Sequence, residues 1–92
     1  VSVHRLTFNL ARWTYDTIVT DTSAADLSQF TITHGGSPVH ATDIATGAGT
    51  TSLYVDYDNL ISAADTWTVS ADQGLVFAGG AALAIPESGA VV

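Results

Sequence analysis

Three histidines are the residues of this chain best suited to hold a transition metal: His4, His34 and His40. His34 and His40 flank a Gly-Gly turn, so the two imidazoles could approach each other. A structural zinc site needs four ligands and a catalytic one three, and no third ligand lies near this pair in the sequence. We therefore expect turn histidines in solvent and no zinc site.

Loop aspartates are the second set of candidate ligands. Asp56 and Asp58 are two residues apart at the end of a predicted strand, so both should point the same way. Calcium takes six to eight oxygen ligands, and the sequence contains no D-x-D-x-D-G loop. Aspartate also favours turns for purely local reasons. We therefore favour a role in the turn for Asp56 and Asp58, which remain weak candidates for calcium binding. No cofactor is expected.

Nucleophilic catalysis would need a serine, threonine or cysteine held beside a base. The chain has no cysteine and no G-x-S-x-G elbow, and its serines, histidines and aspartates share no site pattern. The sequence therefore predicts a protein that is not an enzyme.

Aromatic side chains offer a different chemistry, that of a protein interface, where tyrosine and tryptophan are enriched. Trp13, Tyr15 and Tyr54 are the interface candidates; for Trp13, capping of the end of the fold is an equal alternative. Tyr54 should lie on the outer face of its strand because it alternates with Leu53 and Val55. If Trp13 is an interface residue, its replacement by alanine should weaken attachment and leave the fold intact.

The apolar ends of the chain are a further candidate interface. Residues 1–3 and 90–92, including Val91 and Val92, could pair with a neighbouring subunit by strand addition.

Period-two alternation must position all these residues. It is clearest in Gln29-Phe30-Thr31-Ile32-Thr33-His34, where Gly35-Gly36 then supplies the positive φ angles of a tight hairpin. Another predicted strand covers residues 3–10, and residues 11–18 either extend or flank it. The remaining predicted strands cover residues 38–45, 52–57, 66–70, 76–77 and 82–85. Leu53, Val55 and Tyr57 should share one face, as should Trp67 and Val69. About seven short antiparallel strands with a turn signal every eight to twelve residues predict an all-β immunoglobulin-like sandwich.

Composition limits the classes of partner. Nine acidic residues against Arg5 and Arg12, with no lysine, give a net charge of −7. Binding to nucleic acid needs clustered lysine and arginine, and an anionic membrane attracts the same residues, so neither partner is expected. Membrane insertion is not expected because no run approaches the ~18 apolar residues of a span.

The length of 92 residues fits one domain, residues 1–92. The first five residues contain no basic run followed by an apolar core, so no signal peptide is expected. We interpret the chain as an intact small protein; the alternative is a domain excised from a longer one.

Four segments resemble the SwmB-type bacterial immunoglobulin-like repeat: Asp26-Leu27-Ser28-Gln29-Phe30-Thr31-Ile32, Gly36-Ser37-Pro38-Val39, Ser52-Leu53-Tyr54-Val55 and Asp65-Thr66-Trp67-Thr68-Val69-Ser70. The resemblance runs from about residue 6 to residue 92. Residues 13–19 are more aromatic than the family's turn, and the family's late Asp-Gly-Asn segment is replaced by Ala78-Gly79-Gly80. The resemblance implies a non-enzymatic role in surface or virion assemblies and no catalytic residues.

Three functions remain open. The leading hypothesis is a phage virion component at the virion surface, such as a capsid decoration (cement) protein or a tail-associated module, bound to capsid subunits or to copies of itself. The alternative is a repeat of a large adhesin on the bacterial cell surface. A carbohydrate-binding module ranks third.

Overall fold

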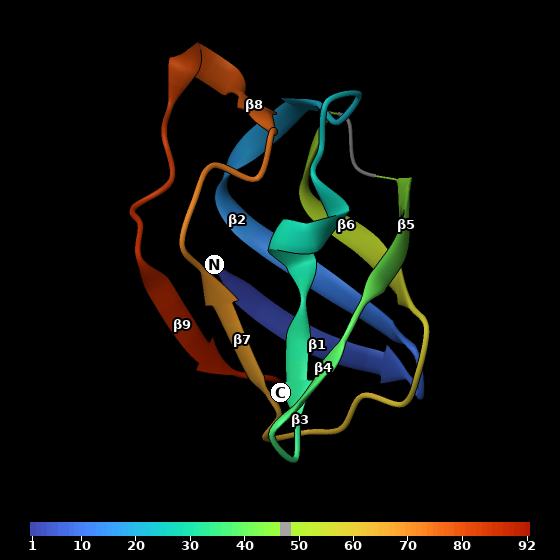
Figure 1. Ribbon diagram of the computed structural model, residues 1–92. Coiled ribbons are helices and arrows are strands. Elements are labelled where there is room, and N and C mark those ends of the chain that lie inside the picture. The colour runs from blue at the N-terminus through green and yellow to red at the C-terminus, as the bar shows by residue number, and fades with distance from the viewer. Residues whose placement is uncertain (47–48) are drawn as a thin grey trace.

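Two antiparallel sheets pack against each other in the computed structural model, which describes residues 1–46 and 49–92 (Figure 1). The first sheet contains β1 (Ser2–Thr7), β2 (Leu10–Asp21), β6 (Thr50–Tyr57) and β5 (Ala41–Thr46) in that order, with β8 (Val76–Phe77) also paired to β2. The second sheet has the order β4 (Ser37–Val39), β3 (Ile32–His34), β7 (Thr66–Val69) and β9 (Glu87–Ala90). Two short 3-10 helices, η1 (Leu27–Phe30) and η2 (Ala78–Gly80), complete the described elements. The predicted all-β sandwich is confirmed.

The order of the strands is that of an immunoglobulin domain. In such a domain strands A, B, E and D form one sheet and C, F and G the other. Here β1-β2-β6-β5 takes the place of A-B-E-D, and β3-β7-β9 takes the place of C-F-G, with β4 added beside β3. The chain changes sheets at His40, between β4 and β5.

The Gly-Gly hairpin forms as predicted, between β3 and β4. Gly35 and Gly36 have φ angles of 56° and 83°, and Ile32 lies opposite Val39. The residues directly before β3 were predicted to belong to the strand. They form η1 instead, and Asp26 caps this helix by accepting a hydrogen bond from the Ser28 amide. Phe30 and Ile32 are nevertheless both buried.

Three predicted strands have wrong limits. The chain reverses at Phe8-Asn9, so residues 3–10 belong to two paired strands, β1 and β2. The strand predicted at residues 38–45 is divided between the two sheets at His40. Residues 82–85 are not a strand, and β9 follows Pro86.

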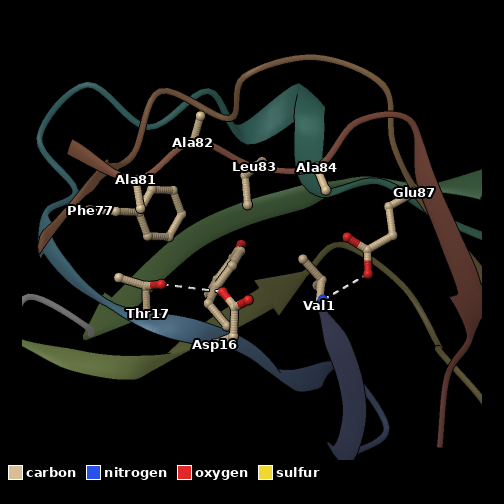
Figure 2. Close-up of a pocket in the computed structure, with 10 residues that line it drawn as sticks. Val1, Asp16, Thr17, Phe77, Ala81, Ala82, Leu83, Ala84 and Glu87 are labelled. Atoms are coloured by element: carbon tan, nitrogen blue, oxygen red, sulfur yellow. Dashed lines mark hydrogen bonds and ion pairs between the residues drawn. The ribbon is translucent and has the colours of Figure 1, made fainter. Parts of the chain in front are cut away.

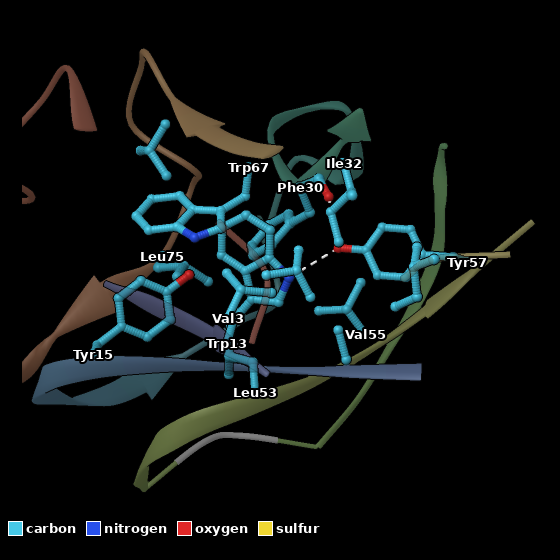
Figure 3. Close-up of a cluster of buried hydrophobic side chains, with 14 of the residues drawn as sticks. Val3, Trp13, Tyr15, Phe30, Ile32, Leu53, Val55, Tyr57, Trp67 and Leu75 are labelled. Carbon is cyan, nitrogen blue, oxygen red and sulfur yellow. Dashed lines mark hydrogen bonds between the residues drawn. The ribbon is translucent and has the colours of Figure 1, made fainter. Parts of the chain in front are cut away.

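The core is an aromatic cluster between the sheets (Figure 3). The Trp13 ring makes T-shaped contacts with Phe30, at 5.2 Å between centroids, and with Trp67, at 5.9 Å. Trp13 and Trp67 lie on the strands that correspond to B and F, which a disulfide joins in antibody domains. In this cysteine-free chain the ring contacts join the two sheets at that position. Leu53, Val55 and Tyr57 are buried on one face of β6, as predicted.

Buried polar groups in this core are hydrogen-bonded. The Trp13 Nε1 donates to the Tyr57 hydroxyl (2.8 Å), which donates to the Phe30 carbonyl oxygen (2.7 Å; Figure 3). The Tyr15 hydroxyl donates to Oε1 of Gln73 (2.7 Å), whose Nε2 donates to the Gln29 carbonyl. Gln73 is fully buried, and its two hydrogen bonds link β2 to η1.

We expect the fold to lose stability above about pH 10, where tyrosine in an unfolded chain ionises. Burial raises the pKa of Tyr15 and Tyr57 well above that value in the folded chain. Their contribution to stability is therefore complete below about pH 10, and above it each tyrosine lowers the free energy of unfolding by about 1.4 kcal/mol per pH unit. Because the chain has no lysine or cysteine, few other groups titrate there.

Urea unfolding at pH 9 and pH 11 measures this effect. Tyr57→Phe should show a shallower dependence on pH, since one of the two groups is gone. An unfolding midpoint that stays constant between these pH values would contradict the prediction.

Candidate interaction surface

Two of the predicted interface aromatics lie in the core. Trp13 is 0% exposed and Tyr15 is 4% exposed, so neither reaches a partner. They share a face, as their spacing predicts, but it is the inner face, because Ala11, Trp13 and Tyr15 alternate with half-buried or exposed neighbours along β2. The prediction of an interface at Trp13 and Tyr15 is therefore wrong. Tyr54 lies half-buried on the outer face of β6, as predicted.

The C-terminal valines also differ from the prediction. Val91 is buried, and its amide donates to the Asp65 carbonyl oxygen (2.7 Å). Val92 has an exposed side chain, but its amide donates to the Val3 carbonyl oxygen and its carbonyl accepts from the Arg5 amide. The backbone expected to pair with a neighbouring subunit thus pairs within the chain, and Val91 is removed from the candidate interface.

The histidines lie apart. His40 is exposed, as expected, and its backbone amide donates to Oδ1 of Asp58 (3.0 Å). The Nδ1 of His34 lies 2.8 Å and 2.9 Å from the two carboxylate oxygens of Asp65, which also accepts from the Ser62 amide. This pair ties the hairpin to the turn that precedes β7, a structural contact that the sequence did not predict.

The two calcium candidates do not share a site. Asp56 projects from the outer face of β6, whereas Asp58 follows the strand and bonds the His40 amide. Within residues 1–46 and 49–92, no three His, Asp or Glu side chains are grouped so as to hold a metal ion.

One hollow of the sandwich is small. It measures about 100 Å³ and lies under residues 81–84, with an ion pair between the Val1 amino group and Glu87 at one end (Figure 2). Pockets for small molecules usually measure about 300–1,000 Å³. Grooves of about 310 and 410 Å³ lie beside it, but the one charged side chain in each, Asp72 or Glu87, already has a partner within the chain.

Exposed apolar side chains gather at the end of the sandwich formed by the β1–β2 turn. Phe8 is 60% exposed, Leu6 42% and Leu60 43%. The Ile61 amide donates to the Phe8 carbonyl oxygen (2.8 Å), and this hydrogen bond holds the Leu60 segment against the turn. The two segments lie side by side in Figure 1. We call these three residues the Phe8 end. The alternation of Leu6 and Phe8 with Thr7 predicted a strand that continues through this turn, and neither residue was identified as a surface candidate.

The outer face of the first sheet carries a second group of surface residues. Leu10 lies opposite Asp56, and Arg12 lies opposite Tyr54, across the β2–β6 pairing. All four are half-buried, because they stand in the middle of the sheet on the face opposite the core. We call Leu10, Arg12, Tyr54 and Asp56 the outer quartet. The sequence identified Tyr54 and Asp56 separately but did not bring them together.

Comparisons with models of protein families, with curated proteins and with solved structures returned no match for this chain. Among the described residues, no helix has the length and apolar character needed to cross a membrane.

Proposed function

We propose that this chain is a non-enzymatic structural protein that attaches to a protein partner through its surface. The leading context is a phage virion, where it would serve as a capsid decoration (cement) protein or a tail-associated module. The observation that carries the proposal is the Phe8 end, where three large apolar side chains are exposed near one turn of an acidic sandwich with a filled core. Clustered apolar surface rimmed by polar residues is typical of protein–protein contact sites.

A repeat of a bacterial adhesin remains the second candidate, since the resemblance to immunoglobulin-like repeats fits both contexts. A carbohydrate-binding module has less support. Such modules use exposed aromatic rings, but Trp13, Tyr15 and Trp67 are in the core.

Replacing Phe8 by serine should weaken attachment at least tenfold and change the stability of the isolated domain by less than about 0.5 kcal/mol. Phe8 occupies an exposed turn, where serine is readily accommodated. Co-sedimentation with virions stripped of the chain measures attachment, and urea unfolding measures stability.

Ile18→Ser is the matched control. Ile18 is exposed to a similar degree but lies at the opposite end of β2. We expect this variant to co-sediment like the wild type. Equal loss of binding in both variants, or no loss in Phe8→Ser, would contradict an attachment through the Phe8 end.

A further inference from the structure

Two aspartates face each other across strands on the outer face of the first sheet, and an arginine on the same face lies opposite a histidine. Arg12 lies directly opposite His4 on β1, and Asp56 lies directly opposite Asp43 on β5. Directly opposed like charges destabilise a sheet. Neither arginine forms an ion pair with any residue that the structure describes, although the chain has nine acidic residues. Among residues 1–46 and 49–92, neither Arg12 nor the Asp43 and Asp56 pair has an oppositely charged partner.

The outer quartet places these charges in a self-complementary pattern. Its four residues form a block in which Arg12 and Asp56 occupy one diagonal and Leu10 and Tyr54 the other. Diagonal neighbours on a sheet lie about 7–8 Å apart, within reach of a long side chain, but Arg12 and Asp56 form no ion pair within the chain. His4 extends the pattern beyond Arg12, and Asp43 extends it beyond Asp56.

We propose that two copies of this chain pair through these outer faces, about a two-fold axis that runs along the diagonal from Leu10 to Tyr54. This rotation brings Arg12 against the partner's Asp56, and Asp56 against the partner's Arg12. It also brings His4 over the partner's Asp43. Leu10 and Tyr54 lie on the axis and meet their own copies, so the centre of the contact is apolar and its charges are matched.

The geometry agrees with a known mode of sheet packing. Strands are about 4.8 Å apart and two residues along a strand span about 6.8 Å, so the diagonal lies about 35° from the strand direction. A two-fold axis along it makes the strands of the two sheets cross at about 70°, close to the orthogonal class of sheet-on-sheet packing.

Charge complementarity favours a second copy as the occupant of this face. A strongly acidic partner would match Arg12 but meet Asp43 and Asp56 unfavourably, and a basic partner would do the reverse. Another copy satisfies both sets at once. The net charge of −7 on each copy opposes association over long distances, but that repulsion is screened beyond about 8 Å at physiological salt.

Sedimentation velocity at physiological salt, over about 1–500 µM protein to cover weak interfaces, tests the pairing. We expect the wild type to form a dimer. Arg12→Asp alone and Asp56→Arg alone should each weaken dimerisation at least tenfold, because like charges then face each other at both contacts. An equimolar mixture of these two variants should dimerise again, since each contact then joins an aspartate of one variant to an arginine of the other.

Asp16→Arg is the control, because it makes the same change of charge as Asp56→Arg, on the outer face of β2, four residues from Arg12. It should dimerise like the wild type. Near-ultraviolet circular dichroism confirms that each variant is folded. A monomeric wild type, a mixture that stays monomeric, or an Asp16→Arg variant as impaired as Asp56→Arg would each overturn the pairing.

This inference deepens the proposed function, since it names a second copy as one partner of the structural protein. Its test uses the purified chain alone. A failed pairing would leave attachment through the Phe8 end untouched, because that contact is measured on virions and lies outside the outer quartet.

Discussion

Replacing Trp13 by alanine is expected to lower the free energy of unfolding by about 3–5 kcal/mol, the usual loss when a buried tryptophan is truncated. Domains of this size are stable by only about 5–15 kcal/mol, so much of the stability should disappear. The ring is fully buried between Phe30 and Trp67, and its Nε1 satisfies the Tyr57 hydroxyl. Urea unfolding followed by circular dichroism measures the change.

Ile18→Ala is the control on the same strand, because Ile18 is exposed. It should lose less than about 1 kcal/mol, the span of strand propensity. If Trp13→Ala instead kept its stability and lost only attachment, Trp13 would be a surface residue and the interface predicted from the sequence would be restored.

Gly74→Ala should have the second-largest effect, a loss of about 2–5 kcal/mol from backbone strain and overpacking together. Gly74 has a φ angle of 77°, and a Cβ there would fall on the carbonyl group of Ala24, with 2.9 Å to its carbon. Backbone cannot move aside as a flexible side chain can. The turn must therefore shift and carry with it the neighbouring Gln73, whose side chain holds Tyr15 and η1.

Gly36→Ala separates these two causes. Gly36 has a similar φ angle of 83°, but a Cβ there would meet nothing within 4 Å. We expect it to lose only the strain of a left-handed residue, about 1–2 kcal/mol. Equal losses in the two variants, measured by urea unfolding, would mean that the close approach of Gly74 to Ala24 is unimportant.

Elements with strong local signals could be predicted from the sequence. Gly35-Gly36 allows positive φ angles at both turn positions, so the hairpin follows from the turn chemistry alone. In residues 52–57 of β6 and throughout β7, inward apolar residues alternate with outward ones, and Leu53, Val55, Trp67 and Val69 are buried as that pattern requires.

Elements with weak local signals could not be predicted from the sequence. The turn at Phe8-Asn9 contains no glycine or proline, and Leu6, Phe8 and Leu10 continue the alternation through it. β9 contains Ser88 and Gly89, which have low strand propensity, whereas the residues before Pro86 are more apolar but form no strand. Gly89 fits there because the Trp67 ring lies where its Cβ would be, a contact 22 residues away in the chain.

The surface was harder to predict than the fold. Alternation shows that Trp13 and Tyr15 share a face, but it does not say whether that face is inside. The outer quartet depends on the pairing register of β2 with β6, which joins residues about 44 positions apart. No local pattern contains that register, so Arg12 was not connected with Asp56.

Mass spectrometry of gradient-purified virions from the source of this sequence tests the central claim most directly, that the chain is a structural component of a particle. We predict that its peptides are present in the purified particles in a fixed ratio to the main capsid protein. Peptides found only in the cell-surface fraction, within a much longer polypeptide, would contradict the virion assignment and support the adhesin repeat.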